Sequence, residues 1–410
     1  MNPRINLKDY EPVVGRSYIE ELRMLASKLA GKTVLNVNST FVGGGVAEIL
    51  SRLVPLLNQL GVDTRWRVIS GDTRFFEVTK KFHNALHGSQ SNSISDEEFS
   101  TFLETTRQNL DQIDLSSDIL FIHDPQPVAL IAKKSDIRSK WIWRCHIDIS
   151  HPDSRVWEFL KQFVVKYHAA VFSSPNFAQE LPIRQFFAPP SIDPLSDKNR
   201  ELSIETVDAV LAKYGLDRDK PLILQVSRFD WLKDPLGVIK AFELVRKNFV
   251  CQLVLAGGAA SDDPESEEVL TKVKERAAGN PDIHVLDIPP NSDLEINALQ
   301  RAATIIMQKS LKEGFALTIT EALWKAKPVV ASAVGGIPLQ VRNKLTGLLC
   351  HSVEGAARAL RQILANPDYG QWLGRNGREH VRQHFLITRE VRDYLLIFLT
   401  AERREDFIYL

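Results

Sequence analysis

Short apolar segments alternate with helical stretches along the chain, in two successive series. The first series opens with a predicted strand, Thr33–Ser39, and a glycine loop, Gly43–Gly45. A helix follows from Val46 to a stop at Gly61, with apolar residues at helical spacing and a kink expected at Pro55. Strands that alternate with helices predict parallel sheets with right-handed crossovers. The other strands predicted in this series are Arg65–Ile69, Ile119–His123, Trp141–His146 and Ala169–Phe172.

A second series of the same kind begins at Pro221. The two series are separated by Ala188–Lys220, whose proline-rich start is a candidate domain boundary. A chain of 410 residues also exceeds one ordinary core. We therefore expect an α/β protein with two Rossmann-like domains, residues 1–192 and 193–385, that face each other across a cleft and bind ligands beyond the carboxyl ends of their strands. The strands predicted in the second series are Leu222–Ser227, Gln252–Ala256, His284–Leu286, Thr304–Gln308 and Pro328–Ala331.

Composition removes several classes of function. Lys plus Arg and Asp plus Glu both number 51, so the chain lacks the basic excess of a nucleic-acid binder. Its three cysteines are far apart, which argues against a structural zinc site and fits a reducing cytoplasm. The first residues do not resemble a signal peptide, and no run of 18 apolar residues would span a membrane. We expect a cytoplasmic protein that binds neither nucleic acid nor membranes.

Two glutamates separated by seven residues, Glu313 and Glu321, lie in a segment that follows a strand and opens a helix. Eight helical steps span roughly 12 Å and return the second side chain to the side of the first. This spacing resembles the distance between the sugar and the ribose of a nucleotide sugar. The N–H groups after Gly314 are suited to a diphosphate between them. Taken alone, the two glutamates are better explained as ordinary surface residues, Glu313 in a loop and Glu321 on a solvated helix face.

Two cations, Arg228 and Lys233, follow another predicted strand and are five residues apart. At a strand end they are suited to clamp a diphosphate, Arg through paired donors and Lys as a point charge. Ordinary surface charge is the alternative interpretation. In the first series, two segments end strands and are candidates to line the cleft: His123-Asp124-Pro125-Gln126-Pro127 and Arg144-Cys145-His146-Ile147-Asp148.

The glycine loop is not a dinucleotide fingerprint, because Glu48 stands where the third glycine belongs. A strand, glycine loop and helix still allow close approach to a phosphate at a helix N-terminus. Taken alone, a tight turn that needs positive φ is the more common reason for such glycines.

Together these segments resemble the retaining nucleotide-sugar glycosyltransferases of family 4, which have the GT-B fold. The matching motifs occur in the family's order: the glycine loop, His146, Arg228 with Lys233, Glu313 with Glu321, and Val334-Gly-Gly-Ile-Pro338. A closer resemblance is to the trehalose glycosyltransferring synthases, carried by VNSTFVGGGVAEIL, FHNALHG, HDPQP, WRCHIDIS and PPSIDPLS. One departure is Ala316, where the family commonly has glycine.

The resemblance implies roles for individual residues on the donor side. Arg228 and Lys233 would neutralise the leaving diphosphate. Glu313 would hold hydroxyls of the donor sugar, and Glu321 those of the ribose. His146 would contact the transferred sugar near its C6 hydroxyl. The resemblance further implies that the last helix, within residues 386–410, crosses back onto the first domain. Phosphates would be gripped by backbone groups at Gly44, Gly45, Ala316 and Leu317.

On the acceptor side, the resemblance implies a free sugar held by polar residues of the first domain. With glucose as both transferred sugar and acceptor, the product would be α,α-trehalose. Attack on the donor's front face, with the departing phosphate taking the acceptor's proton, would retain the anomeric configuration. A double displacement through two close carboxylates remains open at this point. The candidate acceptor-binding residues are Asn38, His83, Asp124, Arg144 and Asp148.

Several alternatives remain at the level of sequence. A phosphorylase of trehalose or another disaccharide would use the same fold with phosphate as a reactant. A family 4 glycosyltransferase with another acceptor is a further alternative. A nicotinamide-dependent oxidoreductase and a catalytically dead sugar-binding protein fit the motifs less well. The nucleobase, uracil or adenine, is not encoded, and the resemblance implies a homodimer. Because Arg228 and Lys233 supply positive charge at the diphosphate, we expect no required metal, although Mg²⁺ is a candidate stimulant.

Overall fold

The computed structural model describes residues 5–41, 44–88, 94–258, 264–289 and 292–402. The chain folds into two compact units, each of which is described by itself. Unit 1 comprises Met1–Ser191 and Ile387–Leu410, and unit 2 comprises Ile192–Leu386. The predicted boundaries, after residues 192 and 385, lie one residue from these divisions.

Unit 1 contains a six-stranded sheet in the order β2-β1-β3-β4-β5-β6, and every pair of neighbouring strands is parallel. The five strands predicted from the sequence are present, with ends that shift by up to two residues. The sixth, β6, escaped prediction because it is a four-residue edge strand without a buried face. The strands are β1 (Thr33–Asn38), β2 (Asp63–Val68), β3 (Ile119–His123), β4 (Lys140–Cys145), β5 (Ala169–Phe172) and β6 (Arg184–Phe187).

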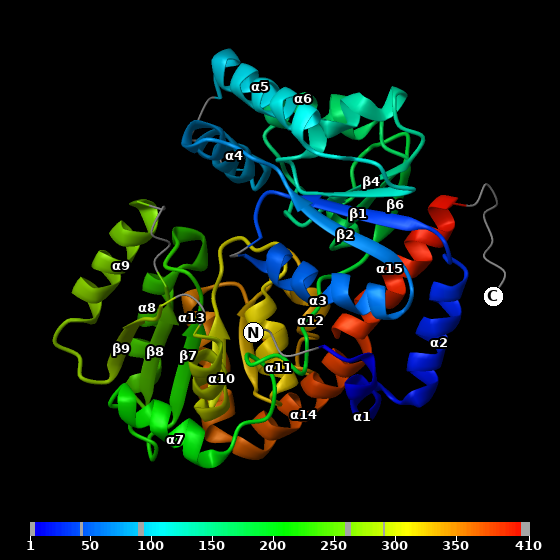
Figure 1. The fold of residues 1–410 in the computed structure, drawn as a ribbon. Helices are drawn as coiled ribbons and strands as arrows, with labels where there is room; N and C mark the ends of the chain where they lie inside the picture. The colour runs from blue at the N-terminus through cyan, green and yellow to red at the C-terminus, as the bar shows by residue number, and fades with distance from the viewer. Residues whose placement is uncertain (1–4, 42–43, 89–93, 259–263, 290–291, 403–410) are drawn as a thin grey trace. The chain divides into compact units, whose positions relative to one another are not determined.

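Helices cover both faces of this sheet, because its central strands are apolar on both sides. One core cluster joins Leu120 and Trp143 to Phe82 and Phe102 of the covering helices, and the other joins Phe121 to Leu53 and Tyr394. The last helix, α15, therefore packs in unit 1 beside α3, which continues through Pro55 (Figure 1). The helices are α1 (Glu11–Val14), α2 (Arg16–Ser27), α3 (Gly45–Gln59), α4 (Thr73–Leu86), α5 (Asp96–Gln112), α6 (Ser154–Val164) and α15 (Ile387–Glu402).

Unit 2 contains a second parallel six-stranded sheet, in the order β12-β11-β10-β7-β8-β9. Its five predicted strands are present, and the three-residue β12 at the edge escaped prediction because it is too short to show a pattern. The strands are β7 (Leu222–Val226), β8 (Gln252–Gly257), β9 (Ile283–Asp287), β10 (Ile305–Gln308), β11 (Val329–Ser332) and β12 (Leu348–Cys350).

The helices of unit 2 also cover both faces of their sheet (Figure 1). The two units thus confirm the predicted α/β class with parallel sheets. Within the described part of the chain, no helix combines the length and apolar character needed to cross a membrane. The helices are α7 (Ile204–Lys213), α8 (Pro235–Arg246), α9 (Pro264–Ala277), α10 (Asp293–Ala302), α11 (Leu317–Trp324), α12 (Ile337–Gln340), α13 (Val353–Ala365) and α14 (Pro367–His384).

Candidate active site

Lys233 and Glu313 form an ion pair at the carboxyl edge of the unit 2 sheet. Lys233 ends a short 3-10 helix (Trp231–Lys233) after β7, and Glu313 lies in the loop after β10. Lys233 Nζ is 2.7 Å from Glu313 Oε2, and the two side chains are only 18% and 11% exposed. The Ser310 hydroxyl donates to the same carboxylate oxygen at 3.1 Å. Partial burial weakens screening by water, so this pair is held more firmly than an exposed one.

Further contacts lock the β7 and β10 loops together around this pair. The Leu311 N–H donates to the Leu232 carbonyl at 2.7 Å. The buried Lys309 donates to the Asp234 carboxylate, whose other oxygen caps α8 by accepting from the Gly237 N–H at 3.0 Å. Lys233 is thus positioned by both loops before any ligand binds.

Arg228 lies differently from Lys233. Its side chain is 58% exposed, and its Nη2 is 3.5 Å from Asp230 Oδ2. At this separation and exposure the pairing is weak. The guanidinium is therefore available to a ligand, although no direct contact joins it to Lys233 or Glu313.

The turn before α11 holds a strained residue. Ala316 has φ +74° and ψ +74°, a left-handed conformation that costs a residue with a Cβ atom. Among the residues that the structure describes, no side chain caps the helix, so the first N–H groups of α11 have no side-chain acceptor there. The buried Gln340 amide donates to the Phe315 carbonyl and accepts from the Thr320 hydroxyl at 2.5 Å, which braces both sides of the turn.

The motif Val334–Pro338, whose last two residues begin α12, packs directly against this turn. A Cβ atom on Gly336 would lie 2.5 Å from the Gly314 carbonyl oxygen, closer than atoms can approach. Gly336 is therefore glycine because the two loops touch at this point.

Glu321 occupies a buried position on α11, with 2% of the residue exposed. Gln300 Nε2 donates to its Oε2 at 3.1 Å. One turn later, Lys325 Nζ donates to the Glu321 carbonyl at 3.3 Å and to Asn199 Oδ1 at 3.1 Å. Burial lowers the pKa of Lys325 to about 7.

In unit 1, His123 and His146 form a chain of hydrogen bonds with Asn36. His123 Nε2 lies 3.1 Å from Asn36 Oδ1, and His123 Nδ1 lies 3.1 Å from His146 Nε2. The Asn36 amide nitrogen faces the Arg65 carbonyl at 3.4 Å, which leaves its oxygen for His123. His123 therefore carries its proton on Nε2, which donates to Asn36, and its Nδ1 accepts. The proton between the two rings then belongs to His146 Nε2, so His146 Nδ1 is unprotonated and can accept a hydrogen bond.

The electrostatics of this edge keep both imidazoles neutral. Burial, followed by the nearby Arg144 charge, lowers the pKa of His123 to about 3 and that of His146 well below its usual value. Asp124 has φ +65° and accepts from the His146 N–H at 2.7 Å through Oδ1. Desolvation raises the pKa of the Asp124 carboxyl to about 6, against the effect of that hydrogen bond.

The predicted acceptor residues fall into two groups. Asn38 and Arg144 are buried: the Asn38 amide is shared between Thr40 O and Trp66 Nε1, both at 2.8 Å, and Arg144 donates to the Ala188 carbonyl at 2.6 Å. These positions favour structural roles over the predicted acceptor contacts. Asp148 is half-buried and accepts from Ser150, and His83 lies on α4 beside His87.

The glycine loop is described in part. Gly44 has φ +79° and lies at the N-terminus of α3, which begins at Gly45 and has no side-chain cap from the described residues. Gly43 lies outside the described residues. At Gly44 the turn itself requires glycine, whatever the loop binds.

Sequence reasoning missed Asn36, Gln300, Ser310 and Gln340, which support the predicted residues. Asn36 left a signal, since it is a polar residue inside the otherwise apolar β1. Gln300 and Gln340 left no signal in the sequence. A polar residue in a helix is ordinarily predicted to be exposed, whereas both of these are buried.

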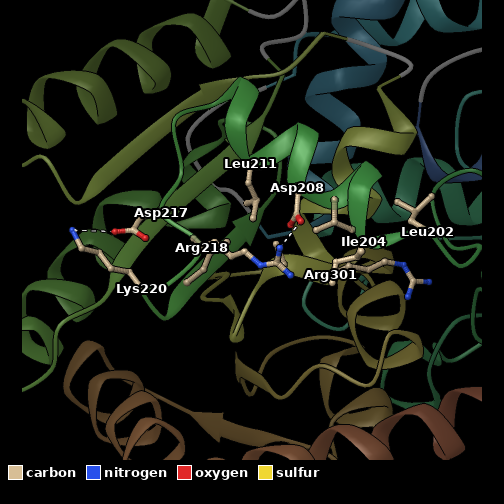
Figure 2. A pocket seen from close by; sticks show the side chains of 11 residues that line it. Leu202, Ile204, Asp208, Leu211, Asp217, Arg218, Lys220 and Arg301 are labelled. Atoms are coloured by element: carbon tan, nitrogen blue, oxygen red, sulfur yellow. Dashed lines mark hydrogen bonds and ion pairs between the residues drawn. The ribbon is translucent and has the colours of Figure 1, made fainter.

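A cavity of about 350 Å³ lies elsewhere in unit 2, beside α7 and the amino end of β7. Figure 2 shows Arg218 directed toward Asp208 and Lys220 toward Asp217 along its wall. Its carboxylates are thus already matched by cations. Because it lies at the amino end of β7, it takes no part in the site at the carboxyl edge.

Comparison with known proteins places the chain in a family. Residues 36–179 match the family model for the trehalose synthase N-terminal domain, and residues 207–380 match the model for group 1 glycosyl transferases. The chain is 43% identical over 394 residues to trehalose synthase of Pyrococcus horikoshii and 42% identical over 402 residues to that of Rubrobacter xylanophilus, covering 95% and 96% of both chains respectively. The chain belongs to the trehalose synthase family.

Solved structures agree on the fold. The trehalose-6-phosphate synthase OtsA matches 89% of this chain and 98% of its own with a TM-score of 0.74, at 13% sequence identity. This likeness and the group 1 domain confirm the GT-B glycosyltransferase fold.

Ala316→Gly is expected to stabilise unit 2. Glycine adopts the left-handed conformation without a steric cost, which should raise the free energy of unfolding by about 1 kcal/mol. The greater freedom of glycine in the unfolded chain offsets part of this gain. Urea denaturation followed by circular dichroism measures it. Ala322→Gly in the middle of α11 is the control, and it should destabilise. Equal destabilisation by both substitutions would contradict the strain at Ala316.

The histidine chain predicts acid sensitivity of unit 1. Because the folded-state pKa values of His123 and His146 are lowered, their contribution is present above pH 6.5 and is lost as the pH falls toward 3. The raised pKa of Asp124 has the opposite effect, because its protonation below about pH 6 stabilises the folded state. This effect comes from one group, whereas two histidines contribute the loss of stability.

His123→Gln should therefore flatten the decline of the unfolding free energy between pH 6.5 and 5, by up to about 1.4 kcal/mol per pH unit. Denaturant titrations at several pH values measure the slope. His351→Gln, at an exposed position, serves as the control and should leave the slope unchanged. A parallel slope in wild type and His123→Gln would exclude this role.

Proposed function

We propose that the protein transfers glucose from a nucleoside-diphosphate glucose to the anomeric hydroxyl of free glucose, with retention of configuration, giving α,α-trehalose. The observation that carries the proposal is the Lys233–Glu313 pair, prepositioned at the carboxyl edge of unit 2 beside the uncapped start of α11. Family membership supports the donor and product classes.

Departure of the diphosphate places negative charge on its oxygens and positive charge on the sugar ring. In the proposal, Lys233 and Arg228 stabilise the former charge in the transition state, together with the backbone N–H groups at Ala316 and Leu317. Lys233 needs no reorganisation because two loops already hold it. The exposed Arg228 moves onto the phosphate from solvent.

Glu313 is proposed to accept hydrogen bonds from donor-sugar hydroxyls. Its Oε2 is occupied by Lys233 and Ser310, which fixes the carboxylate and leaves Oε1 for a ligand. The proposed contact of Glu321 with the ribose uses a carboxylate that Gln300 already orients. Gly44 and Gly45 are proposed to bring backbone N–H groups to a phosphate at the start of α3.

His146 is proposed to accept a hydrogen bond from a hydroxyl of the transferred sugar through Nδ1. The tautomer of His146 supports this contact. The hydrogen-bond chain to Asn36 places the proton of His146 on Nε2, which leaves Nδ1 as the acceptor. A neutral imidazole also adds no positive charge beside the cationic sugar ring of the transition state. Asp124, Asp148 and His83 remain the proposed acceptor contacts on this unit.

The product test uses UDP-glucose or ADP-glucose with ¹³C-labelled glucose. Trehalose is expected as a non-reducing disaccharide with a single anomeric NMR signal. Parallel reactions contain maltose alone, or trehalose with inorganic phosphate. Formation of trehalose from maltose without nucleotide would contradict the proposal and identify the activity as isomerisation. Formation of glucose phosphate from trehalose without nucleotide would contradict it and identify the activity as phosphorolysis.

Arg228→Ala is expected to lower kcat by about 10²–10³-fold, the range for loss of one transition-state donor. Arg228→Lys should recover part of this rate because it restores charge without the paired donors. Arg276→Ala, which removes an exposed arginine of the same unit, should leave kcat unchanged. Steady-state release of the nucleoside diphosphate provides the measurement, and wild-type turnover by Arg228→Ala would refute the clamp.

A further inference from the structure

A second cavity, of about 430 Å³, lies in unit 1 at the amino edge of its sheet. Lys140 begins β4, and Lys32, Asp118 and His168 each immediately precede a strand. The imidazole chain of His123 and His146 is at the carboxyl ends of β3 and β4, so this cavity is separate from the candidate active site.

The lining of the cavity has more cationic than anionic side chains, and both of its carboxylates pair with the same lysine. Lys32 Nζ lies 3.4 Å from Asp118 and 2.6 Å from Glu402, the two carboxylates of the lining. Asp118 also accepts from the N–H and hydroxyl of Thr33, at 2.9 and 3.0 Å. Both carboxylates are therefore engaged with groups other than the remaining cations.

Three cations of the lining, Lys134, Arg138 and Lys140, have no carboxylate partner among the residues that the structure describes. Lys134 donates to the Lys166 carbonyl, which orients its ammonium group without neutralising it. Burial lowers the pKa of Lys134, and the Lys140 charge lowers it further. A neighbouring anion would relieve this repulsion.

His168 adds a directed donor. Its Nδ1 accepts from the Trp141 N–H at 2.9 Å, so the neutral ring carries its proton on Nε2. Burial and then Lys134 and Lys140 lower the pKa of this imidazole, which keeps it neutral. Two ammonium groups, a guanidinium and an imidazole N–H together match the several acceptor oxygens of one tetrahedral oxyanion.

We propose that this cavity binds a phosphate group, either as inorganic phosphate or as the phosphate monoester of a small metabolite. The volume exceeds that of a bare phosphate and lies in the usual range for small-molecule sites. Because the cavity is at the opposite edge of the sheet from His146, the bound anion would be an effector or a stabilising ligand, not a reactant.

Isothermal titration calorimetry on the full chain, at constant ionic strength, tests the site with inorganic phosphate and, in a separate arm, glucose 6-phosphate. The test variant combines Arg138→Gln and Lys140→Gln. The matched control combines Lys28→Gln and Lys133→Gln, which removes two charges from the same unit outside the cavity lining. Arg228→Ala reports on phosphate bound at the candidate active site. Nucleoside-diphosphate release without phosphate checks that each unit 1 variant is folded and active.

The site predicts that the Arg138/Lys140 variant weakens phosphate binding by tenfold or more, as expected for loss of charge-assisted hydrogen bonds. The control pair and Arg228→Ala should bind as wild type does. Tighter binding of glucose 6-phosphate than of phosphate identifies the monoester as the ligand, and equal binding identifies the inorganic ion. No binding by wild type at millimolar concentration, or loss in Arg228→Ala alone, would overturn the proposal.

Discussion

Parallel pairing of all strands in each sheet determines where chemistry can occur in this protein. Parallel strands end at one edge, so residues far apart in sequence meet there. In unit 2 this brings Lys233, after β7, to Glu313, after β10, across 80 positions of sequence. In unit 1 it brings His123, at the end of β3, to His146, just beyond β4. Neither contact could form if one strand of the pair ran in the opposite direction.

The two edges use different electrostatics. Unit 2 holds charged side chains in partly buried pairs, as in Lys233–Glu313, where each charge is compensated by its partner. Unit 1 instead excludes charge from its imidazoles through burial and the adjacent Arg144. These environments suit different parts of the proposed glycosyl transfer, since a diphosphate needs cations and a sugar hydroxyl needs neutral acceptors and donors.

The sequence predicted most strands of both sheets because buried parallel strands are apolar runs. Of the strands in the described part of the chain, it missed the short edge strands β6 and β12. It also placed Lys233 and Glu313 at strand ends. The sequence could not show which of the polar side chains at strand ends are buried. Arg144 and Asn38 lie at strand ends, yet their side chains are buried and make hydrogen bonds within unit 1. Burial depends on the packing of helices that are distant in sequence, which a local pattern does not record.

Ala316 shows how this packing can maintain a residue against its own preference. The turn must pass Gly336 at van der Waals contact, while Gln340 holds the Phe315 carbonyl and the Thr320 hydroxyl on either side of it. These constraints fix the chain path through residue 316 whatever side chain is present there, so alanine is forced into the left-handed region. The strain is localised in the turn that presents the N–H groups of α11. Backbone geometry at the proposed phosphate grip is therefore imposed by its neighbours and does not depend on a glycine at position 316.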